Sequence, residues 1–371
     1  MDDLPETVLQ FGAGKFLRAF ADLFIHQANQ GGQPVGRVVV VQSTGTERAQ
    51  LLNRQGGRYH VLVRGLADGE TIDRTEDSAS ISRALVAATE WEQVREVARS
   101  PELRTIISNT AEAGYDLNPL DRPDLSPPAS FPAKLLLLLH ERFQSRQPGV
   151  TIVPCELHER NANLLQRLVI GLAESWRLTP DFVRWMRKEC RWLNTLVDRI
   201  VTGPPKDHPL VQADALLSLA EPFAFWAIEE KPGTEDFLRH PAVRRAADVR
   251  PFFLRKVRIL NAAHSAMVHK AREHGIALVR EAVAHPAIRD WLDRLLFDEI
   301  VPTLEGRVEA PEEFARQTIE RFQNPFLEHK FTDIAVYHDA KVKIRLVPTG
   351  AEFVEKFGRD PPLLDEAIQA H

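Results

Sequence analysis

Cysteine is scarce in this chain: its 371 residues include only Cys155 and Cys190, too few for a framework of disulfide bonds. No apolar run approaches the roughly 20 residues that a membrane-spanning helix needs. Nothing indicates nucleic-acid binding, which needs clustered basic residues, since the formal net charge is -5. The first residues, Met-Asp-Asp-Leu-Pro, lack the basic and apolar regions of a signal peptide. No cysteines and histidines have the spacing of a zinc site. We therefore expect a cytoplasmic, metal-independent protein with no nucleic-acid or membrane partner.

The composition is that of a globular protein, with 44% hydrophobic and 27% charged residues, and the length allows two domains. Strand and helix signals alternate through the first ~155 residues, which is typical of a parallel sheet covered by helices on both faces. Most of the later chain has helical periodicity. We predict an α/β protein with a Rossmann-type doubly wound sheet domain at residues 1–245, followed by a mainly α-helical C-terminal domain at 246–371. The oligomeric state is left open.

The predicted elements follow from runs of apolar residues and their period. Buried strands are expected at residues 7–11, 37–42, 104–110 and 150–155, and a hairpin at 59–73. Helices are expected at residues 15–28, 82–88, 91–98, 131–143, 161–176, 180–194 and 252–272, with others further on.

A glycine pair follows the first predicted strand and opens the first helix. Gly12 permits a tight turn, and Gly14 allows a phosphate to approach the backbone, where the helix N-terminus offers free N–H groups. Leu17 stands where a third glycine is usual. This context predicts a dinucleotide-binding turn.

The other cofactor contacts should lie beyond the carboxyl ends of the parallel strands. No Asp or Glu ends the second strand, where Gln42-Ser43 stands, so NAD and NADP both remain open. Residues 109–114 could hold a ribose or could simply cap a helix. The residues expected around NAD, with NADP not excluded, are Phe11, Gly12, Gly14, Lys15, Phe16, Gln42, Ser43, Asn109, Thr110 and Glu112.

Lys256, Asn261 and His264 place an amine, an amide and an imidazole in one short segment. On a regular α-helix, Asn261 lies about 140° and His264 about 80° around from Lys256, so all three fall within half of the circumference. Such a group could bind and protonate a sugar oxygen. An ordinary amphipathic helix with a surface lysine is the alternative.

Further polar groups lie within apolar patterns. Asn194 and Asp198 are four residues apart and would share a helix face, with Arg199 next to them. Cys155 could be a nucleophile, but a buried thiol at a strand end is the favoured interpretation.

These motifs come in a characteristic order: Gly-x-Gly-x-x-x-Arg, Ser-Asn-Thr-x-Glu-Ala-Gly, Phe-Pro-x-Lys-Leu, Pro-Cys-Glu-Leu, Asn-x-x-Val-Asp-Arg-Ile, Glu-Pro-Phe and Lys-x-x-x-x-Asn-x-x-His. In this order, the chain resembles the polyol-specific long-chain dehydrogenase/reductase (mannitol dehydrogenase) family. Within the family, the motifs at residues 154–157 and 255–261 are most similar to the members that interconvert a keto-sugar acid and its hydroxy acid, of the tagaturonate and altronate type.

The resemblance implies an NAD(P)-dependent oxidoreductase that needs no metal. Lys256 would be the general acid/base, Asn194 and Asn261 would donate hydrogen bonds to the reacting oxygen, and His264 would bind a neighbouring hydroxyl. A sugar acid also needs a cation for its carboxylate. The residues expected around the substrate are Asp198, Arg199, Arg258 and Arg345, with Lys341 and Lys343 as further candidate cations.

The chain departs from the family pattern at a few places. It is shorter than expected, Ala262 stands where a glycine is common, and Asn161-Ala-Asn163 replaces a more usual Asn-Gly. Mannitol, mannitol-1-phosphate or fructuronate therefore stay open as alternative substrates. A nucleotide-binding regulator without catalysis is a remote alternative.

Overall fold

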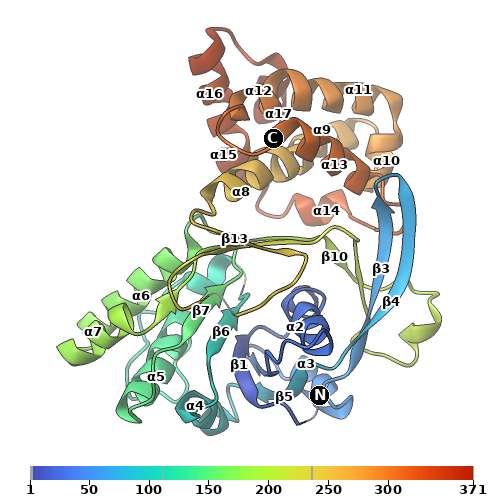
Figure 1. Cartoon of the computed structure of the whole chain (residues 1–371). Helices are drawn as coiled ribbons and strands as arrows, with labels where there is room; N and C mark the ends of the chain where they lie inside the picture. The colour runs from blue at the N-terminus through green and yellow to red at the C-terminus, as the bar shows by residue number, and fades with distance from the viewer. Residues whose placement is uncertain (1–2, 111, 235–236, 371) are drawn as a thin grey trace. The chain divides into compact units, whose positions relative to one another are not determined.

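A computed structural model describes residues 3–110, 112–234 and 237–370 of the chain (Figure 1). The structure divides into two compact units. The first contains residues 1–62, 75–218 and 224–249, and the second contains residues 63–74, 219–223 and 250–371. Within the described ranges, no helix is long and apolar enough to cross a membrane.

A six-stranded sheet with the order β5-β2-β1-β6-β7-β8 forms the centre of the first unit. Each neighbouring pair is parallel, as predicted for a doubly wound fold. The strand order changes direction between β1 and β6, and this point is where such sheets bind ligands. The strands are β1 (Glu6–Phe11), β2 (Arg37–Gln42), β5 (Ile81–Val86), β6 (Thr105–Ser108), β7 (Thr151–Pro154) and β8 (Arg191–Trp192).

Alternating side chains of β1 divide between the two faces of this sheet. Leu9 and Phe11 belong to a core cluster with helices α4 to α6, whereas the side chain of Gln10 bonds Asp22 in α2. In Figure 1, the green helices α5, α6 and α7 lie together beside β6 and β7. The helices of this unit are α1 (Lys15–Arg18), α2 (Ala21–Gln30), α3 (Glu47–Arg54), α4 (Trp91–Arg99), α5 (Phe131–Gln144), α6 (Asn161–Ser175) and α7 (Pro180–Lys188), with the short helices η1 (Glu112–Tyr115) and η2 (Pro209–Val211).

The structure corrects three expected helices. The helix predicted at residues 15–28 is broken, because Phe20 has φ -134° and ψ -97°, which separates α1 from α2. Residues 82–88 form no helix; most of them belong to strand β5, whose pairing with β2 buries Ile81 and Leu85. The helix expected to reach residue 194 ends at Lys188.

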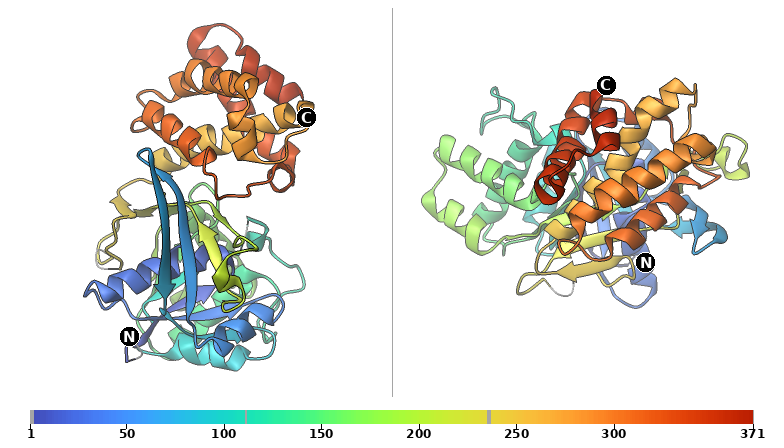
Figure 2. Two further views of the ribbon diagram at one scale, coloured as in Figure 1. Left: turned by 90° about the vertical axis from the view of Figure 1, so that its right-hand side faces the viewer. Right: turned by 90° about the horizontal axis from the view of Figure 1, so that it is seen from above.

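Two smaller sheets accompany the main one. One has the order β10-β11-β3-β4, and Figure 2 shows β3 and β4 side by side in blue, as the predicted hairpin requires. The other has the order β13-β12-β9. Their strands are β3 (Tyr59–Ala67), β4 (Glu70–Ser78), β9 (Thr195–Asp198), β10 (Val201–Thr202), β11 (Ser218–Ala220), β12 (Phe225–Glu229) and β13 (Val243–Ala246).

Helices from the C-terminal part of the chain make up most of the second unit (orange to red in Figure 2). Their apolar faces form one core around Ala266, Leu292 and Leu346, so the predicted mainly helical C-terminal region is confirmed. The helices are α8 (Arg250–Arg255), η3 (Lys256–Asn261), α9 (Ala262–Glu273), α10 (Val279–Ala284), α11 (Pro286–Arg294), η4 (Leu295–Ile300), α12 (Val301–Leu304), α13 (Pro311–Phe322), α14 (Phe331–Ile334), α15 (His338–Arg345), α16 (Val347–Phe357) and α17 (Pro362–Gln369).

Two segments from the first two thirds of the chain belong to this helical unit. Asn324 donates to the carbonyl of Arg64 at 2.9 Å, and Glu320 accepts from the backbone of Gly69 at 2.7 Å. Arg321 forms a two-pronged ion pair with Glu221, at 2.8 and 2.9 Å, and both side chains are almost fully buried. Nothing in the sequence pattern indicated these attachments.

Candidate functional site

Gly12 lies at the carboxyl end of β1, at the point where the strand order changes direction. Its φ is +121°, and a Cβ added there would be 2.7 Å from the carbonyl oxygen of Asn109. The position therefore requires glycine because β1 and the chain after β6 approach each other closely. Arg18 supports this turn by donating to the carbonyl of Ala13 at 2.7 Å.

Gly14 differs from Gly12 in its surroundings. Its φ is -70°, it immediately precedes α1, and a Cβ added there would meet nothing within 4 Å. Lys15 is exposed and Phe16 half-buried at the start of α1, while Phe11 is buried in β1. The turn thus has the open backbone approach that a pyrophosphate needs, and its residues fit a dinucleotide.

Gln42, at the end of β2, has a structural role. The amide of Gln42 donates to the carbonyl of Thr44 at 2.8 Å and accepts from the backbone of Ala49 at 2.7 Å. The side chain therefore holds the turn into α3, while Ser43 is exposed.

Glu156 organises the chain after β6, a role that the sequence did not predict. Its carboxylate accepts hydrogen bonds from Ser108, from the backbone and hydroxyl of Thr110, and from Tyr115, at 2.9 to 3.2 Å. Burial raises the pKa of this carboxyl, and these donors act in the opposite direction. Asn109 in turn donates to the carbonyl of Cys155 at 2.9 Å. The side chain of Glu112, also expected near the cofactor, lies outside the described part of the chain.

The thiol of Cys155 is buried, and burial raises its pKa well above the ordinary value. A thiol in this state is a poor nucleophile. The favoured interpretation, a buried thiol at a strand end, agrees with this environment.

The segment from Lys256 to Asn261 is a π-helical turn between α8 and α9, where a regular α-helix was expected. A π-helix bonds each residue to the fifth one along, so Asn261 lies about 50° around from Lys256 rather than about 140°. Single π-turns are frequent at functional sites. The π-turn therefore brings Lys256 and Asn261 closer to one face than the regular α-helix that the sequence predicted.

Asn261 and His264 both bury a polar nitrogen that has no hydrogen-bond partner among the described residues, namely Nδ2 of Asn261 and Nε2 of His264. Unpaired buried polar groups are costly, so a ligand that bonds to them would be strongly favoured. Burial lowers the pKa of His264 well below its usual range, and the nearby basic side chains of His329, Arg345, Arg321 and Lys256 act in the same direction. Of these, Arg345 and Lys256 place positive charge near the imidazole, whereas Arg321 is paired with Glu221.

The expected carboxylate-binding cations have different environments. Arg258 is committed to Thr349 at 2.7 Å and to Glu352 at 3.2 Å. Arg345 donates to the hydroxyl of Ser265, next to His264, at 3.1 Å. Lys341 donates to the carbonyl of Ile334 at 2.8 Å, whereas Lys343 is exposed. Among the expected cations of the second unit, Arg345 is the one bonded beside His264.

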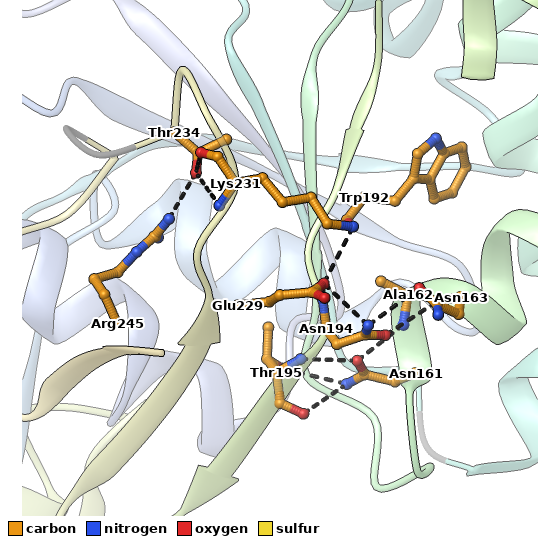
Figure 3. Close-up of polar contacts among 10 residues, drawn as sticks. All are labelled: Asn161, Ala162, Asn163, Trp192, Asn194, Thr195, Glu229, Lys231, Thr234 and Arg245. Carbon is orange, nitrogen blue, oxygen red and sulfur yellow. Dashed lines mark hydrogen bonds and ion pairs between the residues drawn. The ribbon is translucent and has the colours of Figure 1, made fainter. Parts of the chain in front are cut away.

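Asn194 belongs to the first unit and precedes strand β9. The prediction that it shares a helix face with Asp198 is therefore wrong. Figure 3 shows its amide between Glu229 and the start of α6. Nδ2 donates to Glu229 at 3.0 Å and to Oδ1 of Asn163 at 3.1 Å, and Oδ1 accepts from the backbone of Asn163 at 3.1 Å. Asn161 next to it bonds the backbone of Thr195.

Asp198 and Arg199, also expected near the substrate, are buried in the first unit. Asp198 ends β9 opposite Phe225. Arg199 donates to the carbonyl of Ala19 at 2.7 Å, and its guanidinium lies 6.0 Å from the ring of Phe24. A substrate role for either residue stays a prediction.

A possible metal-binding group occurs elsewhere, at His269, Glu273 and Glu366. Lys270 pairs with both carboxylates, and Trp291 donates to Glu366 at 2.8 Å. Lys270 therefore balances the negative charge of Glu273 and Glu366 in this cluster.

A glycine turn at the switch point of a parallel sheet, together with a lysine, an amide and an imidazole on one helix, defines a Rossmann-type dehydrogenase. The family comparison agrees with this class. Residues 6–238 match the mannitol dehydrogenase Rossmann domain and residues 248–364 match the mannitol dehydrogenase C-terminal domain. The chain belongs to the mannitol dehydrogenase family and is a dehydrogenase acting on a CH–OH group.

Curated relatives are named altronate oxidoreductase. The protein from Bacillus subtilis (strain 168) is 37% identical over 97% of this chain and 78% of its own length. The one from Halalkalibacterium halodurans is 38% identical over 97% of this chain and 73% of its own length. The one from Klebsiella pneumoniae (strain 342) is 36% identical over 99% of this chain and 79% of its own length.

Solved structures show the same fold. Mannitol 2-dehydrogenase from Pseudomonas fluorescens, in a ternary complex with NAD and D-mannitol, superposes with a TM-score of 0.84 at 20% identity, covering 99% of this chain and 78% of that one. Substrate-free D-sorbitol dehydrogenase gives a TM-score of 0.84 at 21% identity, covering 100% and 80%.

Proposed function

We propose that this protein interconverts a keto-sugar acid and its hydroxy acid, of the tagaturonate and altronate type, with NAD as the cofactor. The observation that carries the substrate class is the position of Arg345, a cation that is bonded to Ser265 next to His264. A carboxylated sugar complements such a site better than a neutral polyol. The curated relatives named altronate oxidoreductase support the same substrate.

The roles of the helical segment follow from its chemistry. Lys256 would exchange a proton with the reacting oxygen, and Nδ2 of Asn261 would donate a hydrogen bond to that oxygen. His264, kept neutral by burial, would bond a neighbouring hydroxyl through Nε2. Arg345 would hold the carboxylate, because it is already fixed beside His264 by Ser265.

The turn at Gly12 and Gly14 would hold the pyrophosphate of the cofactor, with Asn109 and Thr110 beyond the neighbouring strand. A bound nicotinamide would supply or accept the hydride at the carbon that carries the reacting oxygen. Glu156 would support the cofactor-binding residues by keeping Ser108, Thr110 and Tyr115 in place.

The test is the oxidation of NADH and of NADPH, followed at 340 nm, with tagaturonate, fructuronate, fructose and fructose 6-phosphate. Turnover with tagaturonate and not with the neutral or phosphorylated ketoses is the expected result. Turnover confined to fructose or its phosphate would overturn the substrate but keep the reaction class.

Lys256→Ala separates an enzyme from a regulator that only binds nucleotide. We expect it to lose turnover by roughly 10²- to 10⁴-fold, the usual contribution of a general acid/base. Its affinity for NADH, measured by fluorescence, should stay that of the wild type. Normal turnover by this variant would show that the proposed mechanism is wrong.

A further inference from the structure

The orientation of the Asn194 amide is determined by two partners of fixed polarity. The carboxylate of Glu229 can only accept a hydrogen bond, so it faces Nδ2 of Asn194, at 3.0 Å. The backbone N–H of Asn163 can only donate, so it faces Oδ1, at 3.1 Å. Glu229 also accepts from the backbone N–H of Asn194 at 3.0 Å. Both ends of the side chain are therefore held, and it cannot turn over without losing bonds at each end.

Nδ2 of Asn194 has two hydrogens, and both are bonded. One goes to Glu229, and the other goes to Oδ1 of Asn163 at 3.1 Å (Figure 3). If Asn194 is to donate to a substrate oxygen, one of these two bonds has to be replaced. A bond to a charged carboxylate is roughly twice as strong as one between two neutral amides. The bond to Asn163 is consequently the one that a substrate oxygen would replace.

We propose that Glu229 is a positioning residue for Asn194. In the free enzyme, Oδ1 of Asn163 accepts the second hydrogen bond from Nδ2 of Asn194, and the substrate oxygen replaces it as the acceptor. This inference rests on the proposed function together with the role that the resemblance implies for Asn194, a donor to the reacting oxygen. It also assigns a role to Asn163, one of the positions where the chain departs from the family pattern. Neither Glu229 nor Asn163 was expected from the sequence to take part in the site.

Lys231 completes the arrangement by holding Glu229. Its ammonium lies 3.1 Å from the same carboxylate oxygen and donates to the carbonyl of Trp192 at 2.5 Å. The turn that carries Lys231 is closed by Thr234, whose hydroxyl donates to the carbonyl of Lys231 at 2.7 Å and accepts from Arg245 at 2.7 Å. Glu229 therefore remains in place when the bond to Asn163 is exchanged.

The test compares Glu229→Ala, Glu229→Gln and Asn163→Ala with a control, Glu174→Gln, which removes an exposed carboxylate from the same helix as Asn163. With the substrate that the wild type turns over, Glu229→Ala should lower kcat about 10- to 100-fold, because a small misplacement near the reacting atoms has such an effect. Glu229→Gln should recover most of the loss, since its amide oxygen still accepts from Nδ2. Asn163→Ala should keep kcat and lower KM, because the competing acceptor is gone.

A second readout needs no substrate. In a spectrum of protein with ¹⁵N-labelled asparagine, the side-chain NH₂ signal of Asn194, assigned by its absence in Asn194→Asp, should move in Glu229→Ala and stay in Glu174→Gln. An unmoved signal, or an unchanged kcat in Glu229→Ala, would overturn the inference. If the wild type prefers a neutral ketose, the proposed substrate fails, and the inference is still tested with that ketose.

Discussion

The imidazole of His264 meets that of His329 edge-on, with ring centroids 4.6 Å apart and planes at 72°. His329 is held by backbone bonds on both sides, because Val279 donates to its carbonyl and the next residue, Lys330, pairs with Leu278. Burial lowers the pKa of His329 to about 4 and that of His264 well below its ordinary value. Two neutral imidazoles therefore lie together at neutral pH, so His264 can bond a hydroxyl but cannot serve as a cationic acid.

This pair predicts a loss of stability in acid. The unfolded chain takes up protons at these histidines near pH 6.5, whereas the folded chain does so only at lower pH, about 4 for His329. Their contribution to the free energy of unfolding is therefore present above pH 6.5 and falls as the pH drops towards 4. Replacing His329 with Phe keeps an aromatic ring and removes the titration. In urea unfolding, this variant should lose less stability between pH 7 and pH 4.5 than the wild type, with exposed His274→Gln as the control.

Asp22 predicts a pH effect of the opposite sign. Burial raises the pKa of this carboxyl to about 7, while its bond from Gln10 acts against the shift. The folded state holds the proton more tightly than the unfolded state, so stability falls as the pH rises from about 4 to 7. Asp22→Asn cannot ionise and should be more stable than the wild type at pH 8, measured by urea unfolding. Equal stability at pH 8 would mean that Asp22 has no raised pKa.

Gly12 and Gly14 form a matched pair that separates folding from cofactor binding. Gly12→Ala forces a Cβ to within 2.7 Å of the Asn109 carbonyl at φ +121°, and it should lower the free energy of unfolding. Its cost should be about 1–3 kcal/mol, as for other strained backbone positions. Gly14→Ala meets nothing within 4 Å and should fold normally. If a pyrophosphate approaches this backbone, Gly14→Ala should weaken NADH binding without changing the melting temperature. Unchanged affinity would place the cofactor elsewhere.

Arg345 should determine the preference for a carboxylated substrate. Arg345→Met removes a charged hydrogen-bond donor, worth about 1.5–3 kcal/mol, and should raise KM for the keto-sugar acid roughly 10- to 100-fold. KM for a neutral ketose should change little. Lys343→Met, which removes an exposed charge from the same helix, is the control. Equal effects on both substrates would assign Arg345 a structural role through Ser265.

The parallel sheet and its glycine turn could be predicted because short β-branched runs and a helix-opening glycine pair have local signatures. Strand β5 was missed because Ser82 to Leu85 includes Arg83 and Ala84, good helix formers, and only pairing with β2 decides its conformation. The prediction of a helix around Asn194 was wrong for a similar reason, since the apolar spacing of this segment fits a helix as well as a strand.

The site was predicted only where a motif carries the chemistry. Lys256, Asn261 and His264 could be named, but not the π-turn that brings Lys256 and Asn261 to the same face, because an i→i+5 turn has no sequence signature. Glu156 and Glu229 act through contacts with residues 35 to 48 positions away, and no local pattern reveals such partners. Their roles depend on tertiary structure alone.

The salt bridge of Arg321 with Glu221 has a consequence for how this architecture can be divided. A fragment that begins at Arg250 lacks Glu221 and would bury a guanidinium without its carboxylate, which is strongly destabilising. It would also lack residues 63–74, where Arg64 accepts from Asn324, just after α13, and Gly69 donates to Glu320 in α13. A recombination crossover near residue 248 would therefore separate partners that must be inherited together. The two halves can be exchanged between relatives only if residues 63–74 and 219–223 are exchanged together with the C-terminal half.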